Sequence, residues 1–378
     1  MKFTKILLAT LSLAFIQSCS NNDDEIIELN KGTLNVSYDA TRLKTTTIEP
    51  TISGFENATY TWKLGNEIIG NEKSLGFVSD KAGSYDLTLE IKSLTKTSTL
   101  KTTVKVAQES STYSKYISQV FDYLPAVGQF TNKLPAYVDG DTQTEMTAKA
   151  GKALIGEKPS MITLGGYGGY VVFGFDHTIL NQKDKRDFKV LGNGFAGSSE
   201  PGIIMVAYDK NKNGKPDEDE WYEIAGSEYS NPTTIKNYTI TYHKPAVEDS
   251  KATPEYIKWE DNQGKSGYKA KNTFHKQSYY PLWFGQNQLK FSGSLLANNY
   301  TEKNGIWTGK QLAYGYADNA ANNSEDSNID IDWAVDKNGN PVKLMGIDFI
   351  KVYTATNQEA GWLGEISTEV AGAYDLHL

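Results

Sequence analysis

The sequence predicts an all-β protein: a small N-terminal β-sandwich followed by a larger β-sandwich or jelly-roll-like domain with long loops. Apolar residues alternate with polar ones over many short segments, which is the period of a half-buried strand. The 378 residues include 23 tyrosines and 33 glycines, a composition typical of strands and tight turns. A polar stretch at residues 108–112 divides the two expected domains.

The beginning of the chain predicts export and a lipid anchor. Two lysines precede an apolar stretch at residues 6–16, which has the length of a signal peptide and is too short to span a bilayer. Ser18 stands directly before Cys19, as in a bacterial lipobox. We therefore expect residues 1–18 to be a lipoprotein signal peptide and Cys19 to be acylated. The alternative is an ordinary signal peptide followed by an incidental cysteine.

Residues 19–30 are expected to form an acidic surface tether. Asp23, Asp24 and Glu25 follow the cysteine closely, and this run resembles the signal that sends Bacteroidetes lipoproteins to the outer face of the outer membrane. The plain alternative is a solvated linker. Nothing else in the sequence has the character of a membrane span, so we expect an anchored protein that faces the extracellular side.

Residues 31–107 predict the smaller sandwich. Apolar side chains alternate along 34–38, 60–64 and 85–91, and turn residues separate these stretches. The Tyr-Thr-Trp of residues 60–62 and the Gly-Ser-Tyr-Asp-Leu of residues 83–87 resemble PKD-type immunoglobulin-like modules. Such modules are usually spacers or adhesion units, so we assign these aromatic rings to the core.

Residues 112–378 predict the larger domain. Strand patterns occur at 170–173, 202–206, 238–242, 329–333 and 347–353. At the beginning of this domain, Ile117, Val120, Phe121 and Leu124 have helical spacing and predict a short amphipathic helix. The chain has no internal repeat, which argues against a propeller.

Composition excludes several classes of protein. The formal net charge is −8, which is unfavourable for binding to nucleic acid. A single cysteine excludes a disulfide scaffold and a cysteine-based zinc site. The glycine-rich run at 165–169 lacks the lysine and hydroxyl residue of a phosphate-binding loop, so we interpret it as a flexible turn before a strand.

An acidic loop beginning at Asp209 follows the spacing of an EF-hand calcium loop. Oxygen-bearing side chains fall at positions 1, 3, 5, 9 and 12, and glycine stands at position 6. The flanking segments have strand character, and the alternative is an acidic turn without metal. If Ca²⁺ binds, we expect a structural role for the ion and these ligands: Asp209, Asn211, Asn213, Lys215, Asp217 and Glu220.

No residues in the sequence point strongly to catalysis. The chain has no Gly-x-Ser-x-Gly elbow, and its four histidines lack zinc-site spacing. Two acidic pairs, Asp330 with Asp332 and Glu365 with Glu369, have the chemistry of glycosidase carboxylates. The first pair alternates with apolar residues and is interpreted as the solvent face of a strand. We expect a protein that is not an enzyme.

The aromatic segment at residues 274–284 is the strongest candidate for a ligand site. Aromatic rings mixed with amides on loops form hydrogen-bonding platforms for large polar ligands. The alternative is that these rings pack beneath long loops. The predicted ligand-binding residues are Tyr279, Tyr280, Trp283, His275, Gln277 and Trp307.

Several motifs resemble one family over nearly the whole mature chain. They include Gly-Gly-Tyr-Gly-Gly-Tyr at 165–170, Trp-Tyr-Glu-Ile-Ala-Gly-Ser at 221–227, Asp-Phe-Ile-Lys-Val-Tyr at 348–353 and Gly-Trp-Leu-Gly-Glu-Ile at 361–366. They resemble Bacteroidetes "cell surface protein" lipoproteins that carry an N-terminal PKD-like module. The resemblance implies a partner of a TonB-dependent outer-membrane transporter and, as ligand, vitamin B12 or another corrinoid.

From the sequence we expect a surface lipoprotein that captures a nutrient, with a corrinoid as the leading ligand. The first alternative is a glycan-binding surface lipoprotein of a polysaccharide-utilisation system. The second is a β-sandwich glycoside hydrolase or lyase.

Overall fold

The computed structural model describes residues 32–157, 160–248 and 251–378. The expected signal peptide, Cys19 and the acidic tether lie outside these residues. Strands predominate in the described chain, and α1 (Gln143–Leu154) is its one α-helix. The prediction of an all-β protein is therefore confirmed. No helix in the described ranges is long and apolar enough to cross a membrane.

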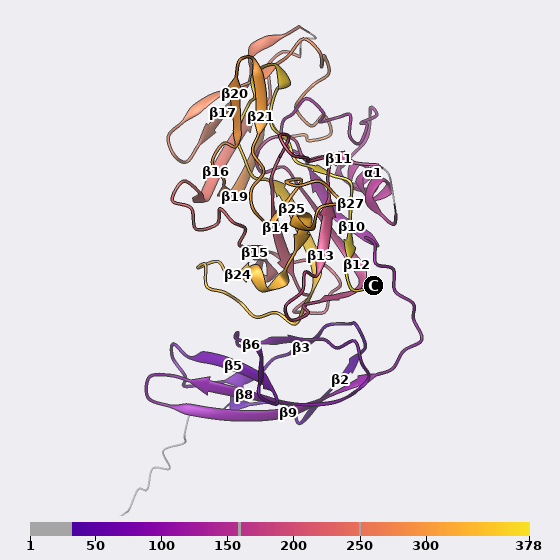
Figure 1. Cartoon of the computed structure of the whole chain (residues 1–378), viewed down its shortest axis with the longest axis vertical. Helices are drawn as coiled ribbons and strands as arrows, with labels where there is room; N and C mark the ends of the chain where they lie inside the picture. The colour runs from indigo at the N-terminus through magenta and orange to yellow at the C-terminus, as the bar shows by residue number, and fades with distance from the viewer. Residues whose placement is uncertain (1–31, 158–159, 249–250) are drawn as a thin grey trace, which may run out of the picture.

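Two bodies follow each other along the chain, and the first is a small sandwich (Figure 1). A five-stranded sheet with the order β2-β9-β8-β5-β6 is covered by the β3-β7 pair. The predicted alternation is visible in β8, where Leu87, Leu89 and Ile91 are buried. The strands are β1 (Gly32–Thr33), β2 (Ser37–Thr41), β3 (Thr46–Ile48), β4 (Thr51–Ile52), β5 (Thr59–Leu64), β6 (Glu67–Gly70), β7 (Leu75–Phe77), β8 (Gly83–Lys92) and β9 (Thr97–Ala107).

The larger body is built around a seven-stranded sheet with the order β10-β12-β25-β14-β15-β24, to which β22 adds by pairing with β14. A four-stranded sheet, β18-β17-β16-β19, and a three-stranded sheet, β23-β13-β27, complete its main layers. The strands of the central sheet are β10 (Gln119–Leu124), β12 (Tyr170–Leu180), β14 (Gly202–Ala207), β15 (Tyr222–Ile224), β22 (Tyr316–Ala317), β24 (Ala334–Val335) and β25 (Gly346–Thr354). The other strands are β11 (Ile162–Thr163), β13 (Phe188–Leu191), β16 (Ile235–His243), β17 (Thr253–Asp261), β18 (Ser266–Lys271), β19 (Gln288–Leu295), β20 (Tyr300–Lys303), β21 (Ile306–Gly309), β23 (Asn328–Ile329), β26 (Glu369–Val370) and β27 (Gly372–Asp375).

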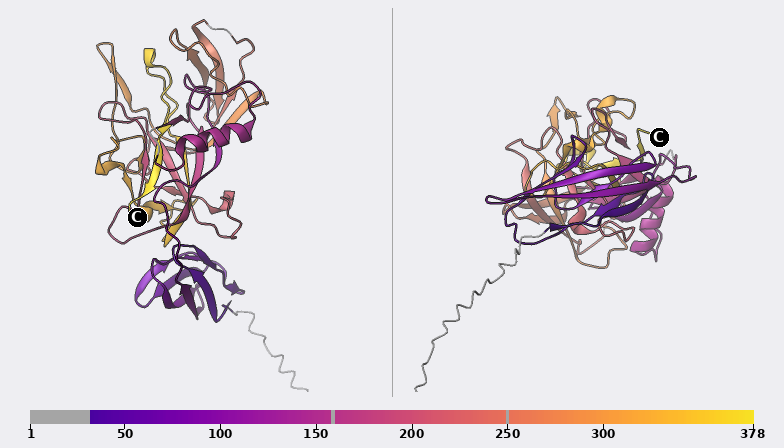
Figure 2. Two further views of the ribbon diagram at one scale, coloured as in Figure 1. Left: turned by 90° about the vertical axis from the view of Figure 1, so that its right-hand side faces the viewer. Right: turned by 90° about the horizontal axis from the view of Figure 1, so that it is seen from below.

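The central sheet is buried on both faces. In β14, Ile204 packs into a core shared with α1 and β13, while its neighbour Ile203 packs into a core shared with the four-stranded sheet. On β25, Val352 likewise packs into the first of these cores and its neighbour Tyr353 into the second. Because successive side chains of a strand point to opposite faces, these strands read as nearly continuous apolar runs. Figure 2 shows α1 lying along one side of this body.

Two predictions about local structure are wrong. Residues 119–124 form strand β10 and not a helix, because a bulge between Val120 and Asp122 interrupts the alternation that would have indicated a strand. The predicted strand at 329–333 is the two-residue β23 followed by the 3-10 helix η3 (Ile331–Trp333). The Asp330 carboxylate accepts a hydrogen bond from the Asp332 amide and caps that turn.

The two bodies are joined by partly buried polar contacts as well as by the linker. The Asp348 carboxylate on β25 accepts hydrogen bonds from the Thr45 hydroxyl (3.2 Å), the Thr178 hydroxyl (2.6 Å) and the Asp209 amide (2.9 Å). Thr45 belongs to the smaller body and the other three residues to the larger one. Burial raises the pKa of Asp348. The smaller sandwich is therefore fixed to the central sheet by specific contacts.

Candidate functional site

A pocket of about 630 Å³ lies in the larger body. We call it the distal pocket, because β11, β20 and β21 near it lie in the half of the larger body away from the smaller sandwich (Figure 1). Six segments of the chain that are far apart in sequence contribute to its lining: 129–134, 161, 193–200, 272–275, 300 and 362–369. The smaller sandwich contributes none of the described residues in this lining.

Trp362 forms one aromatic wall of the distal pocket. Its side chain is 61% exposed, an unusual position for an indole. It stands on a short turn that is closed by a hydrogen bond from the Ala360 amide to the Gly364 carbonyl (2.8 Å). Gly361 has a φ of +55°, and a Cβ there would lie 2.6 Å from the Trp307 indole nitrogen. Trp307 thus supports the turn from beneath.

Phe274 and His275 form a second aromatic part of the lining. Phe274 is 72% exposed, and the Asn272 side-chain oxygen accepts hydrogen bonds from the amides of both residues (3.0 and 2.9 Å). The His275 ring meets the edge of Phe130 at a centroid distance of 4.9 Å. The Asn272 amide group also donates to the Gln129 side-chain oxygen (2.7 Å). Amide groups and rings are therefore held rigidly beside each other.

Carboxyl groups gather at the floor. One oxygen each from Glu200, Asp318 and Glu369 lies within 4.8 Å of the others. Asp318 accepts hydrogen bonds from the backbone amides of Asn193, Gly194 and Glu369 at 2.7, 2.6 and 2.9 Å. Glu369 accepts from the hydroxyls of Thr163 (3.0 Å) and Ser367 (2.7 Å) and also contacts Glu200 by a side-chain hydrogen bond. These are also the residues with the chemistry to hold a cation.

The electrostatics of this floor favour protonated carboxyl groups. Burial, followed by repulsion from the Glu369 carboxylate, raises the pKa of Glu200 and raises the pKa of Asp318 to about 8. Burial also raises the pKa of Glu369 and raises that of Glu365 to about 8. A proton shared between Glu200 and Glu369 is enough to relieve their repulsion. At neutral pH the floor therefore offers hydroxyl donors as well as carboxylate acceptors.

A pH titration of stability tests the buried Glu365. Its pKa is about 8 in the folded chain and about 4.3 in an unfolded one, so between these values the folded state binds more protons. The free energy of unfolding should therefore fall as the pH rises from about 5 to 8, by up to ~1.4 kcal/mol per pH unit for this group. Urea unfolding of the Glu365→Gln variant should show a shallower slope. Identical slopes in variant and wild type would refute this assignment.

The predicted aromatic platform is largely internal. Tyr279 and Tyr280 are only 1% and 0% exposed, and their hydroxyls donate to the carbonyls of His275 (3.2 Å) and Gln286 (2.8 Å). The structure therefore corrects their assignment as ligand anchors. They belong to the core under the four-stranded sheet, where large rings bury the most apolar area.

Trp283 is also a packing residue. Its ring stacks between Tyr123 and Tyr137, with centroid distances of 6.3 and 6.2 Å, and its indole nitrogen donates to the Gln143 side chain (2.8 Å). It holds α1 against β10 and does not face the distal pocket. The prediction of a ligand anchor at this position is corrected as well.

The other predicted ligand-binding residues lie in or beside the distal pocket. His275 lines it, and the Gln277 side chain donates to the Gln129 carbonyl behind the wall. Sequence reasoning did not single out Trp362 or Phe274 as binding residues. Two acidic pairs were considered for catalysis, and both members of one pair, Glu365 and Glu369, line the pocket. The other pair lies elsewhere, since Asp330 pairs with Arg186 at 2.5 Å.

The acidic loop is ordered by its own hydrogen bonds. The Asp209 carboxylate accepts from the amides of Asn213 (3.1 Å) and Gly214 (2.8 Å). The side-chain amide nitrogens of Asn211 and Asn213 both donate to Asp217. The other two predicted ligands also lie in this loop. The Lys215 amide donates to the Asn213 side chain (2.7 Å), and the buried Glu220 carboxylate accepts from the amides of Lys210 and Asp217.

Calcium binding by this loop stays a prediction, and a chelator tests it. If Ca²⁺ binds only to the folded chain, a chelator should lower the melting temperature and added Ca²⁺ should restore it. The Asp209→Ala variant should be insensitive to both, although it melts earlier because two loop amides lose their acceptor. A wild-type melting curve that is indifferent to chelator would identify a plain acidic turn.

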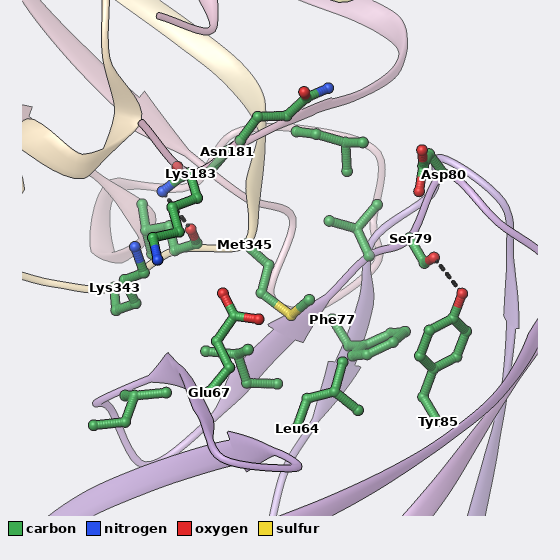
Figure 3. A pocket seen from close by; sticks show the side chains of 16 residues that line it. Leu64, Glu67, Phe77, Ser79, Asp80, Tyr85, Asn181, Lys183, Lys343 and Met345 are labelled. Atoms are coloured by element: carbon green, nitrogen blue, oxygen red, sulfur yellow. Dashed lines mark hydrogen bonds between the residues drawn. The ribbon is translucent and has the colours of Figure 1, made fainter. Parts of the chain in front are cut away.

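A second cleft, of about 400 Å³, lies between the two bodies (Figure 3). Met345 from the larger body points towards Leu64 and Phe77 of the smaller one (Figure 3). The remaining lining mixes aliphatic with polar residues, and the lysines come from the larger body while the acids come from the smaller one. Two docked surfaces that do not meet completely leave such a cleft. The larger distal pocket, with exposed rings above converging amides and carboxyls, has the features of a ligand site.

Comparisons with known proteins agree with the fold. Residues 36–93 match the PKD-like domain family, which confirms the prediction of a PKD-type module for these residues. No curated protein matches the chain. The chain is similar to a quinonprotein alcohol dehydrogenase-like protein, BT1487, from Bacteroides thetaiotaomicron, with 14% identity, 50% of this chain and 44% of that chain covered, and a TM-score of 0.18.

Two further solved structures align along most of the chain. One is the SusE-like protein BT2857, with 9% identity, coverage of 91% of this chain and 95% of that chain, and a TM-score of 0.26. The other comes from a study of carbohydrate-binding modules of the β-sandwich superfamily, with 10% identity, coverage of 92% and 97%, and a TM-score of 0.19. Scores this low carry no functional argument, so the function is argued from the distal pocket itself.

Proposed function

We propose that the protein is a surface lipoprotein that captures a carbohydrate in the distal pocket and does not convert it chemically. One observation carries the proposal: the exposed rings of Trp362 and Phe274 line the same pocket as buried carboxyl and amide groups. A sugar ring has an apolar face that stacks on an aromatic ring, and hydroxyls that both donate and accept hydrogen bonds.

The chemistry of the floor supports this ligand class. Glu365 and Glu369 are 5% and 4% exposed, so their hydrogen bonds to a ligand would form in a largely water-excluded environment. Carboxyl groups with raised pKa values donate to sugar oxygens when protonated and accept from hydroxyls when ionised. The side chains of Asn193, Ser198 and Asn272 extend the polar lining.

The position of the pocket supports capture at a surface. Gly32, the first described residue, lies in the smaller sandwich, at the opposite end of the molecule from β20 and β21 (Figures 1 and 2). A lipid at Cys19 would therefore present the distal pocket away from the membrane. Delivery to a TonB-dependent transporter remains part of the proposal, on the strength of the family resemblance.

The corrinoid expected from the family resemblance loses its residue-level support, because Tyr279, Tyr280 and Trp283 are packing residues. It is tested in the same experiment as the carbohydrate. A glycan array probed with the mature chain, followed by isothermal titration of the best oligosaccharide and of cyanocobalamin, distinguishes the two. Saturable binding of an oligosaccharide supports the proposal, and binding of cyanocobalamin alone refutes it.

Product analysis tests the absence of turnover. The bound oligosaccharide should be recovered unchanged by chromatography after prolonged incubation with the protein. Shorter products that disappear in the Glu365→Gln or Glu369→Gln variant would identify a hydrolase or lyase instead.

A further inference from the structure

The acidic groups of the distal pocket are neutral when protonated and negative when ionised, so they can supply charge of one sign only. Glu200, Glu365 and Glu369 line it, and Asp318 lies behind them. Among the described residues, the lining contains no lysine or arginine. His275 is the remaining titratable group in the lining apart from Tyr300; burial and the nearby Lys133 lower the pKa of this histidine and favour its neutral form.

The lysines near these acidic groups do not make the pocket positive overall. Lys133 is exposed, so solvent screens its charge. Lys269 is 3% exposed and interacts with Glu365 and Glu359, and burial lowers the pKa of its amine. The positive charge of Lys269 can neutralise at most one of the acidic groups. A ligand that enters the pocket therefore meets acidic groups that can become negative but not positive, in a poorly hydrated environment where charges interact strongly.

We infer that the distal pocket selects its sugar by charge, so that for sugars of one size affinity falls in the order amine-bearing, neutral, carboxylate-bearing. This inference rests on the proposed function and adds the ligand class. Glu365 and Glu369 are the specificity-determining residues, because both are buried and both line the pocket. A uronate or sulfate would be repelled by each carboxyl group that is ionised and would find no lysine or arginine in the described lining, while an ammonium group would stabilise an ionised carboxylate and pair with it.

Matched monosaccharides test the order without knowledge of the natural linkage. The probes are glucosamine, glucose and glucuronate, with galactosamine, galactose and galacturonate as a second series, each titrated at millimolar concentration into the mature chain and followed by NMR. In a series that binds, we expect the amine to bind about 5- to 10-fold more tightly than the neutral sugar, and the uronate to bind more weakly than either.

Two variants assign the effect to the pocket. Glu365→Gln keeps an acceptor for the Gln129 amide but removes a carboxyl group that an ammonium ligand can ionise and pair with, so the affinity ratio of amine to uronate should fall by about 5- to 10-fold. Glu255→Gln is the matched control, because Glu255 is exposed on β17 and lies outside the lining. It should leave the ratio of the wild type unchanged.

The outcomes separate this inference from the proposed function. Uronates that bind as tightly as neutral sugars, or a ratio that Glu365→Gln does not change, would overturn charge selection and leave carbohydrate capture standing. If none of the six sugars binds and the glycan array is also negative, both the proposed function and the inference are refuted.

Discussion

Replacing Gly169 by alanine is expected to lower the free energy of unfolding by about 3 kcal/mol or more. A Cβ at this position would lie 1.9 Å from the Leu164 carbonyl oxygen and 2.2 Å from the Ala126 amide nitrogen. These two groups form a backbone hydrogen bond with each other (2.9 Å), which the methyl group would break. Chemical unfolding monitored by circular dichroism measures the loss.

Gly285→Ala is the control for this variant. Gly285 is exposed, and a Cβ there meets no atom within 4 Å, so its substitution should change stability by less than about 0.5 kcal/mol. A Gly169→Ala protein as stable as the control would contradict the close packing of this turn. The result bears on the interpretation of residues 165–169 as flexible, since the structure buries all five.

Replacing Trp362 by alanine is expected to weaken carbohydrate binding by about 5- to 150-fold, or ~1–3 kcal/mol. The indole is the largest exposed ring of the distal pocket, and a stacked sugar would cover much of it. Because the side chain is already exposed, its removal should not shift the melting temperature appreciably. Isothermal titration and thermal melting of the same preparation separate the two effects.

Tyr268→Ala provides a control with an aromatic residue of similar exposure. Tyr268 is 43% exposed on β18 but lies outside the pocket lining. Its loss should leave the dissociation constant within about twofold of the wild type. Equal effects of the two substitutions, or normal binding by Trp362→Ala, would refute the placement of the site.

Strands are predicted correctly where apolar and polar residues alternate regularly, and the prediction is wrong where this alternation is interrupted. Leu87, Leu89 and Ile91 lie on one face of β8, as their spacing predicts. In β10 the bulge after Val120 shifts the pattern by one residue, and the remaining apolar spacing imitates a helix. The real helix has its own signals, since Thr142 and Glu145 form a capping box.

The candidate site was only partly predictable, because it is assembled from distant segments. His275 lines the distal pocket, as a surface position in the predicted segment would, but adjacent rings in an aromatic run are sorted by tertiary packing. Tyr279 and Tyr280 pass beneath the four-stranded sheet, whereas Phe274 remains outside. The exposure of Trp362 depends on Trp307 and Gly361 meeting across the fold, which sequence spacing does not reveal.

A crystal structure of the mature chain bound to its best oligosaccharide tests the central claim most directly. We predict a sugar ring stacked on the Trp362 indole, with hydroxyls hydrogen-bonded to Glu365 or to Asn272 in the lining of the distal pocket. A sugar bound instead in the cleft between the two bodies, or on a surface remote from Trp362, would contradict the account.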